Sequence, residues 1–446
     1  MKQIFITAVF SFGLFASVVA QEKSWTLDDC MQYAVENSPK VRQQIYVNNT
    51  YKAEHQSAIT AFLPTASANT SIQYNFGRAI DPNTNTYTNT STFNNYYEVF
   101  ARLTLFSGGQ LINQWRLANV NIHKGQNDLQ KQKDDLSINV MAAYVDVVYC
   151  NGMVGMLTEK LEESKRTLYK TQRQEELGLK GKADVAQIES QVAADDYNLT
   201  HQQNLYNTAV MTLKNSMNYP VDSVLPIDTL AKKMDYFYAV EPVDEIFDLA
   251  ANNNPTAMQA AFEYKTSKMT YLIMKGGLLP TISFGAGIYT SYYENLKSDK
   301  TKISFSDQFQ NNQGKNIQFS LSFPLFDGLS RVTKTRRARN NMQIAYEKQI
   351  EVLRQLQTDI EQAVLDREGY AKEAVKMEKK VEADGLAYQV TLRKYEEGLM
   401  SPIDLQTSAN ILLESKAGLL QKQLLYIIKS RLVEYYKGKP IIATEN

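Results

Sequence analysis

The sequence predicts a mainly helical chain with some β-structure. Long coiled helical hairpins would form an α-barrel, and four strands per chain would contribute to a shared twelve-stranded β-barrel of a trimer. Three observations lead to this fold class. Glycine and proline number only 20 and 11 in 446 residues, below the usual shares of about 7% and 5%. A series of landmarks occurs twice in the same order, and each copy contains two segments in which apolar and polar residues alternate.

The composition limits the classes of function. Lys and Arg (48) balance Asp and Glu (48), so no one-sided field favours nucleic acid as a partner. The mean hydropathy of -0.38 argues against a bundle of transmembrane helices, each of which needs ~20 apolar residues. His55, His123 and His201 lie far apart, and Cys30 and Cys150 lack CxxC spacing. We therefore predict no metal site, no other cofactor and no disulfide framework.

The N-terminus is typical of a secretory signal peptide. Lys2 precedes an apolar run that ends at Val18-Val19-Ala20, the pattern of a charged segment, an apolar segment and a small-residue cleavage site. We expect residues 1–20 to be removed and the mature chain to begin at Gln21. An N-terminal membrane anchor is the alternative, but the run is short for a membrane span.

The mature chain is predicted to consist of two structural repeats, residues 21–230 and 231–446. Four landmarks recur in the same order: Ala34 to Pro39 with Ala250 to Pro255, Leu63-Pro64-Thr65 with Leu279-Pro280-Thr281, Leu105-Phe106-Ser107-Gly108 with Leu325-Phe326-Asp327-Gly328, and Gly178-Leu179 with Gly398-Leu399. Chance matches would not stay collinear, so we interpret the chain as two copies of one unit.

Each copy is expected to contribute two amphipathic strands, at about residues 65–80 and 94–106 and at about residues 281–293 and 315–326. In the last of these segments, Phe319, Leu321 and Phe323 alternate with small polar residues, which is the period of a strand with one apolar face. Polar loops at residues 81–92 and 296–313 join the strands of each pair, as in outer-membrane barrels.

The strands predict an oligomer. Four strands are too few to close a barrel, and an open sheet edge in lipid would leave backbone groups unpaired. Chains must therefore share strands, and three chains would supply twelve, an even number within the range of membrane barrels. The apolar face would contact outer-membrane lipid, and the polar face would line a wet lumen. The alternative is a soluble sheet whose apolar face packs against helices.

The remaining segments are expected to form helical hairpins, at about residues 109–217 and 328–436. In the first hairpin, Leu136, Ala143, Cys150 and Leu157 recur every seven residues, as the core positions of a coiled coil do. We therefore interpret Cys150 as a core residue. A continuous helix over residues 109–176 would be roughly 100 Å long at 1.5 Å per residue, a length suited to crossing the periplasm.

Together these landmarks resemble the TolC family of outer-membrane efflux proteins. The resemblance covers nearly the whole mature chain, from Trp25-Thr-Leu-Asp-Asp and Asn37-Ser-Pro39 through both Leu-Pro-Thr strand entries and both Leu-Phe-(Ser/Asp)-Gly strand exits to the two Gly-Leu hairpins. Each motif is short, and the specificity comes from their doubled, collinear order.

The resemblance implies a homotrimer in the cell outer membrane with a long periplasmic extension. It would be the passive exit duct of a tripartite efflux or type I secretion system, gated at the hairpin tips. The implied partners are a periplasmic adaptor (membrane fusion protein) and an inner-membrane pump of the RND, ABC or MFS type. Gly178-Leu179 and Gly398-Leu399 match the tip turns that dock the adaptor in this family. Asp404 matches its pore-constricting aspartate, and Asp184 is the equivalent on the other hairpin.

Two positions depart from the family pattern. Thr407 stands where a second aspartate ring would be, and Met400 stands where the family has a basic residue. We therefore expect a single aspartate ring and weaker closing bonds. Three copies of Asp404 around one axis would favour cations in the pore. Asp404 and Asp184 also suit the first turn of a helix, where carboxylates are favoured for local reasons, so both interpretations stay open.

Two other classes of protein compete with the duct. An enzyme is disfavoured because the sequence contains no nucleophile elbow, phosphate loop or HExxH motif, so we predict no catalytic residues. A structural coiled-coil protein, at the cell surface or as a periplasmic adaptor without channel activity, is the stronger rival. It would contain one strand region or none, whereas this chain repeats its strand pair midway.

Overall fold

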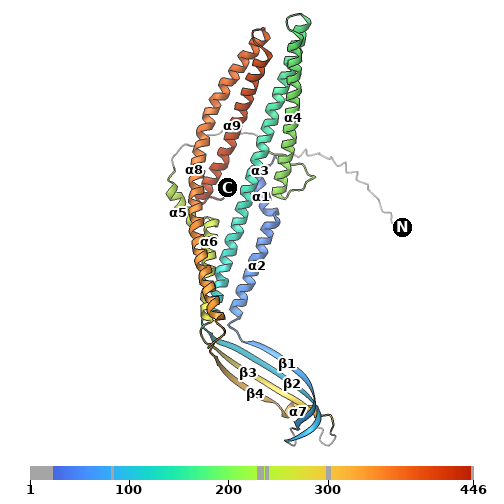
Figure 1. Cartoon of the computed structure of the whole chain (residues 1–446), viewed down its shortest axis with the longest axis vertical. Coiled ribbons are helices and arrows are strands. Elements are labelled where there is room, and N and C mark those ends of the chain that lie inside the picture. Colours follow the sequence, from blue (N-terminus) through green and yellow to red (C-terminus); the bar gives the residue numbers. More distant parts are fainter. Residues whose placement is uncertain (1–23, 82–84, 229–235, 237–240, 298–302, 443–446) are drawn as a thin grey trace, which may run out of the picture.

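The structure is a computed structural model that describes residues 24–81, 85–228, 236, 241–297 and 303–442. The predicted signal peptide, residues 1–20, lies outside the described residues. Figure 1 shows an elongated chain with a sheet at one end and long helices rising from it to the other. The predicted fold class, mainly helical with four strands, is confirmed.

The elements follow one another in two similar series. They are α1 (Leu27–Asn37), α2 (Pro39–Thr60), β1 (Thr65–Asp81), β2 (Thr86–Ser107), α3 (Gln110–Glu176), α4 (Lys182–Met217), α5 (Val243–Asn253), α6 (Pro255–Gly276), β3 (Thr281–Asn295), α7 (Phe305–Asn311), β4 (Gly314–Ser322), α8 (Ser330–Glu396) and α9 (Pro402–Tyr436). Each series is a short helix, a longer helix, a strand pair and a helical hairpin. Only the second series has a helix, α7, between its two strands.

The repeated Pro landmarks are helix starts. Pro39 and Pro255 occupy the first positions of α2 and α6, where the missing N–H has no partner to lose. The preceding residues cap these helices: the Ser38 hydroxyl accepts a hydrogen bond from the N–H of Val41 (3.4 Å), and the Asn254 side chain accepts one from the N–H of Thr256 (2.9 Å). Such caps satisfy N–H groups that have no partner within the helix.

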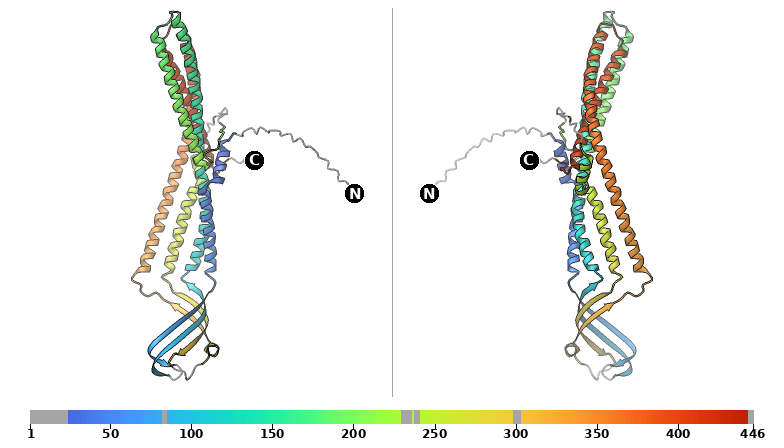
Figure 2. Two further views of the ribbon diagram at one scale, coloured as in Figure 1. Left: turned by 90° about the vertical axis from the view of Figure 1, so that its right-hand side faces the viewer. Right: turned by 90° about the vertical axis from the view of Figure 1, so that its left-hand side faces the viewer.

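The two hairpins, α3 with α4 and α8 with α9, form the long part of the chain. Both α3 and α8 contain 67 residues, which corresponds to roughly 100 Å of helix. Figures 1 and 2 show the hairpin tips at the same end, with α6 lying between α3 and α8 in the half next to the sheet, in contact with both. The α2 helix packs along α3.

Glycine is favoured at both strand exits by backbone conformation, and at the first also by a close contact. Gly108 and Gly328 adopt left-handed φ values of 63° and 66°, which glycine reaches without steric cost. Gly108 also lies directly against the backbone carbonyl of Gly276 at the end of α6, so a side chain at position 108 would collide with it. The Leu-Phe-(Ser/Asp)-Gly landmark thus marks a sharp turn from strand into helix.

The largest apolar core lies midway along the helices. Val140, Met141 and Val147 of α3 are almost fully buried there, packed with residues of α1 and α4.

By length and composition alone, α3 is the one helix of the described chain that could cross a membrane. However, Val140, Met141 and Val147 pack against other helices of the protein. Cys150 belongs to the same core and is 7% exposed, which confirms its interpretation as a core residue. Burial also raises the pKa of the Cys30 thiol to about 12.

The segment before α1 is anchored beside this core. The Trp25 N–H donates to the Pro226 carbonyl (2.7 Å), and the Trp25 carbonyl accepts from the Asp228 N–H (3.0 Å). The guanidinium of Arg431 on α9 donates to both carboxylate oxygens of Asp28 on α1, at 3.0 and 2.8 Å. These bonds connect the N-terminal segment, the stretch after α4 and the last helix.

The four strands form one antiparallel sheet in the order β1-β2-β3-β4. Because directly paired residues share a face, the register shows where the alternating residues point. Leu103, Phe284 and Phe319 form one row across three strands, and Val99 with Ile288 another. Arg102, Gly285 and Gln318 form a row on the opposite face. The sheet therefore has one apolar and one polar face, as the alternation predicted.

Two predicted strand limits and both predicted loops, residues 81–92 and 296–313, are wrong. β2 begins at Thr86, not near residue 94, and pairs with β1 up to its end at Asp81. The β-branched threonines at its start suit a strand, although their polarity is typical of a loop. β4 ends at Ser322, not at residue 326, because Pro324 has no N–H for the ladder. The loop predicted at residues 296–313 contains α7.

Candidate functional site

Both hairpins end in the same kind of glycine turn. Gly178 and Gly398 have φ values of 73° and 78°, the left-handed conformation that commonly follows a helix. The N–H of the next residue, Leu179 or Leu399, donates back to the carbonyl of Gln174 or Lys394, both at 2.8 Å. Each leucine is 70% exposed. The turns thus present exposed leucines at the far end of the helical part, Leu399 on the second hairpin and Leu179 together with Leu177 (74% exposed) on the first.

The two predicted pore aspartates both begin a helix. The Asp404 carboxylate accepts hydrogen bonds from the Ser401 N–H (3.1 Å) and hydroxyl (2.7 Å), and the Ser401 hydroxyl accepts one from the Asp404 N–H (3.3 Å). The Asp184 carboxylate accepts from the Gly181 N–H at 3.1 Å. Both aspartates therefore have the local capping role. The bonds from Ser401 hold the pKa of Asp404 below its ordinary value, so the group is an anion at neutral pH.

The two hairpin ends are joined within one chain through Tyr395 of α8. This side chain is 1% exposed, and its hydroxyl lies 2.9 Å from the hydroxyl of Thr171 on α3. The ammonium of Lys180, in the turn after α3, lies 4.2 Å from the centre of the Tyr395 ring and donates to its carbonyl at 3.3 Å. Such an arrangement combines cation–π attraction with a hydrogen bond.

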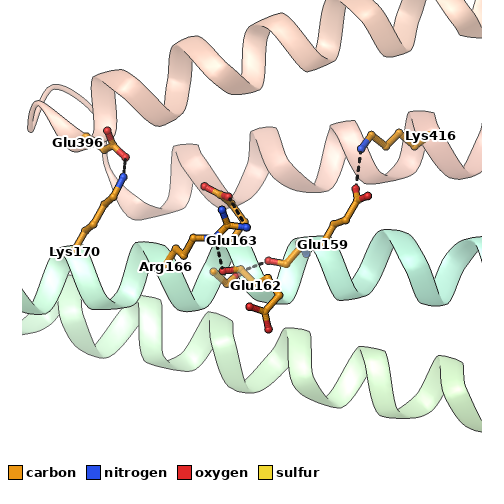
Figure 3. Close-up of polar contacts among 9 residues, drawn as sticks. Glu159, Glu162, Glu163, Arg166, Lys170, Glu396 and Lys416 are labelled. Carbon is orange, nitrogen blue, oxygen red and sulfur yellow. Dashed lines mark hydrogen bonds and ion pairs between the residues drawn. The ribbon is translucent and has the colours of Figure 1, made fainter.

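Charged pairs extend this contact along the helices. Figure 3 shows Lys170 of α3 reaching Glu396 of α8, at 2.6 Å, and Lys416 of α9 reaching Glu159, at 3.4 Å. These side chains are partly exposed, so each pair stabilises the contact by ~1 kcal/mol at most. Their main effect is to set how the two hairpins align.

A buried carboxylate lies farther down the first hairpin. Asp195 of α4 is fully buried and accepts from the Lys160 ammonium (2.8 Å) and the Ser164 hydroxyl (2.5 Å). Lys160 also donates to Asn410 of α9 at 2.7 Å. Asp195 and Asp196 in sequence would suggest a solvated helix face, but the helix pair closes over Asp195. A buried charge of this kind is tolerated only when it is paired.

The pattern of the sequence did not single out Tyr395, Lys180 or Lys160. A signal for Tyr395 did exist, because the second copy has tyrosine where the first has Glu175 at the same distance before the tip glycine. Of the two departures from the family pattern, Thr407 bonds its hydroxyl to the Ile403 carbonyl (2.8 Å). Met400 packs against the small core around Tyr395 and Leu405.

The sheet is the second part of the site. Large apolar side chains of β4 and the residue after it are exposed on one face: Ile317 (74%), Phe319 (72%), Leu321 (64%) and Phe323 (61%). Among the described elements, β4 packs extensively against β3 alone, so its apolar side chains stay exposed. An exposed apolar face of this size marks a contact with lipid or protein. No cluster of His, Cys, Asp and Glu in the described residues could hold a metal ion.

Comparison with known proteins gives a family and a fold. A family model described as outer membrane efflux protein matches residues 30–219. The outer membrane protein VceC of Vibrio cholerae is 14% identical over 92% of this chain and 96% of its own, with a TM-score of 0.79. The CmeC outer membrane channel of Campylobacter jejuni is 13% identical over 98% of this chain and 94% of its own, with a TM-score of 0.78.

A third structure agrees with these two. The MtrE outer membrane channel of Neisseria gonorrhoeae is 16% identical over 92% of this chain and 88% of its own, with a TM-score of 0.73. No curated protein matches the sequence. At such identities the structural likeness establishes the fold, and the family model supports the predicted resemblance over residues 30–219, less than half of the chain. The predicted resemblance to the TolC family is confirmed, and CmeC and MtrE are outer membrane channels.

Proposed function

We propose that this chain, an outer membrane efflux protein of TolC-like fold, assembles as a homotrimer that forms one continuous duct. Twelve strands would span the outer membrane, and the helical hairpins would form a periplasmic tunnel gated at their tips. The duct is passive, and an inner-membrane pump of the RND, ABC or MFS type would supply the energy through a periplasmic adaptor. The substrate would leave through a tripartite efflux or type I secretion system.

One observation carries this proposal: the sheet has two edge strands without a neighbouring strand in the described chain, and one of its faces is apolar. β1 and β4 are its two outer strands, and the exposed side chains of β4 are those that lipid would cover. Unpaired backbone groups cost several kcal/mol each in hydrocarbon. A closed ring of strands from several chains removes both free edges at once.

The first test is assembly and conductance of the mature chain. We expect trimers that resist detergent until heated and that conduct ions in planar lipid bilayers. The competing function, a structural coiled-coil or adaptor protein without channel activity, predicts a soluble chain and no conductance. A non-conducting monomer, purified from the soluble fraction, would refute the duct.

The second test concerns the tips. We propose that Leu179 and Leu399 dock the adaptor, because both are exposed apolar side chains on rigid glycine turns. A photo-reactive residue at either position is expected to capture the adaptor that is encoded for the same system. The same probe at Tyr169, which is 60% exposed on the side of α3, is the control. Equal capture at Tyr169 and at the tips would contradict docking by the turns.

A further inference from the structure

The short helix α7 takes the place of a strand at the edge of the sheet. β4 pairs with β3 only as far as Gly314, opposite Tyr289. Beyond this row the Gln308 side chain accepts a hydrogen bond from the Tyr293 N–H (3.0 Å) and donates to the Tyr293 carbonyl (2.9 Å). Asn312 donates to the Ser291 carbonyl at 2.8 Å. The carboxamide of Gln308 thus makes the pair of bonds that a strand residue would make.

Aromatic side chains hold α7 on the apolar face of the sheet. The ring of Phe309 lies 5.5 Å from that of Tyr97, and the ring of Phe305 lies 5.3 Å from that of Tyr292. The Thr290 hydroxyl donates to the Phe309 carbonyl at 2.8 Å. Phe305 nevertheless stays 48% exposed, as does Ile303 just before the helix. One apolar side of α7 is therefore left exposed within the described part of its own chain.

The lengths of the outer strands show what reaches this side in a trimer. β1 has 17 residues and β4 has 9, so the β4 of one subunit cannot pair with the whole β1 of the next. Strands of a barrel tilt by about 40° and lie about 4.8 Å apart, which shifts the register by about five residues over four strands. One row of directly paired residues crosses the sheet from β1 to β4: Asn69, Glu98, Tyr289 and Gly314. Without a register shift, this row would place Gly314 beside Asn69 of the next subunit.

The direction of the shift follows from the strand limits. If the register shifts away from the helices (outward), Gly314 lies beside a β1 residue near position 74 of the next subunit. All of β4 then pairs with β1 of that subunit. Shifted inward, Gly314 would lie before the start of β1 at Thr65. The outward shift places α7, which flanks the rows of Thr290 to Tyr293, beside β1 residues 75–78 of the neighbour.

Within this stretch one large apolar side chain is uncovered. Phe76 lies on the apolar face and is 76% exposed, whereas Arg78 already stacks over Tyr87 of its own strand pair, 5.4 Å from the ring centre. We propose that α7 is an intersubunit clasp: Phe305 and Ile303 pack against Phe76 of the neighbouring subunit, where β4 has ended. This inference rests on the proposed trimer and adds the surface that closes its outer seam.

The test is cross-linking of paired cysteines in the full chain. We expect a short bismaleimide to join Phe76→Cys with Phe305→Cys between chains, giving covalent dimers and trimers on denaturing gels after heating. The matched control pairs Asn75→Cys with Phe305→Cys, because Asn75 is adjacent in sequence but lies on the opposite face. The clasp predicts several-fold more covalent oligomer for the first pair. Cys30 and Cys150 are buried and do not compete.

Further variants separate the possible failures. Ile303→Cys with Phe76→Cys is a second pair that should also cross-link, in case Phe305→Cys weakens α7. Gln308→Leu, which removes both bonds to Tyr293, should reduce cross-linking of the first pair several-fold. Heat-sensitive trimers that cross-link no more than the Asn75 control would overturn the clasp while leaving the duct intact. Absence of trimers in the unmodified protein would refute the duct itself, and the clasp with it.

Discussion

Replacing Phe319 by lysine is expected to abolish trimers in the outer membrane. Phe319 lies in the middle of β4, is 72% exposed, and packs against Phe284 with the ring centres 4.9 Å apart. A lysine on the lipid face costs up to about 2–4 kcal/mol per site, with the largest cost at the bilayer midplane. Three copies in one barrel would cost up to roughly 6–12 kcal/mol, and the upper part of this range is comparable to the total stability of an ordinary protein.

The adjacent residue provides the matched control. Gln318→Lys adds the same charge one position away, but Gln318 pairs with Gly285 on the polar face, which would line the lumen. It should therefore assemble normally. Both variants would be compared by the heat-sensitive trimer band in outer-membrane fractions. If Gln318→Lys disrupted assembly and Phe319→Lys did not, the two faces would be assigned the wrong way round.

Replacing Asp404 by asparagine is expected to reduce the cation preference of the channel and to weaken block by polyvalent cations. Asparagine keeps an oxygen that can cap α9 in place of the carboxylate, whose bonds to Ser401 the structure shows. The change therefore removes charge more than it removes structure. In a trimer it would take three negative charges from one ring around the pore axis. The measurements are single-channel block and the reversal potential in a salt gradient.

Two further variants make this prediction specific. Asp184→Asn removes the charge on the other hairpin and should have a smaller effect. Thr407→Asp, one turn after Asp404, should add a second ring and strengthen the block. The pKa of Asp404 is held below its ordinary value, so the block should weaken only as the pH falls through that lowered pKa. Correctly assembled Asp404→Asn channels with unchanged block would show that this aspartate serves only as a helix cap.

The features that were predicted correctly from the sequence are those that follow from a repeat of apolar residues within one strand or one helix. The alternation of Phe319, Leu321 and Phe323 indicated the apolar face, and the seven-residue series through Cys150 indicated a buried helix seam. The doubled Gly-Leu turns located both hairpin tips. Each of these follows from the chain's own neighbours in sequence, because strand and helix periods are set by the backbone.

The features that were missed depend on contacts between distant segments. α7 begins in a polar stretch, and its position follows from how Gln308 meets the edge of β3. Tyr395 is buried because the ends of the two hairpins meet around it, with Thr171 of α3 and Leu405 of α9 in the same cluster, and no period within α8 reveals this contact. The burial of Asp195 cannot be seen in the sequence for the same reason, because its partner Lys160 is on the other helix of the hairpin.

The equal length of α3 and α8, 67 residues each, restricts how such a chain can change during evolution. Deleting two turns from one hairpin alone would leave its tip short of the other, so Lys170 could no longer reach Glu396, nor Thr171 reach Tyr395. A change of reach requires matched insertions or deletions in four helices at once, in whole heptads that keep the core seam in register. The distance between the sheet and the tips is therefore a property that single mutations cannot adjust, and a partner at the tips has to fit it.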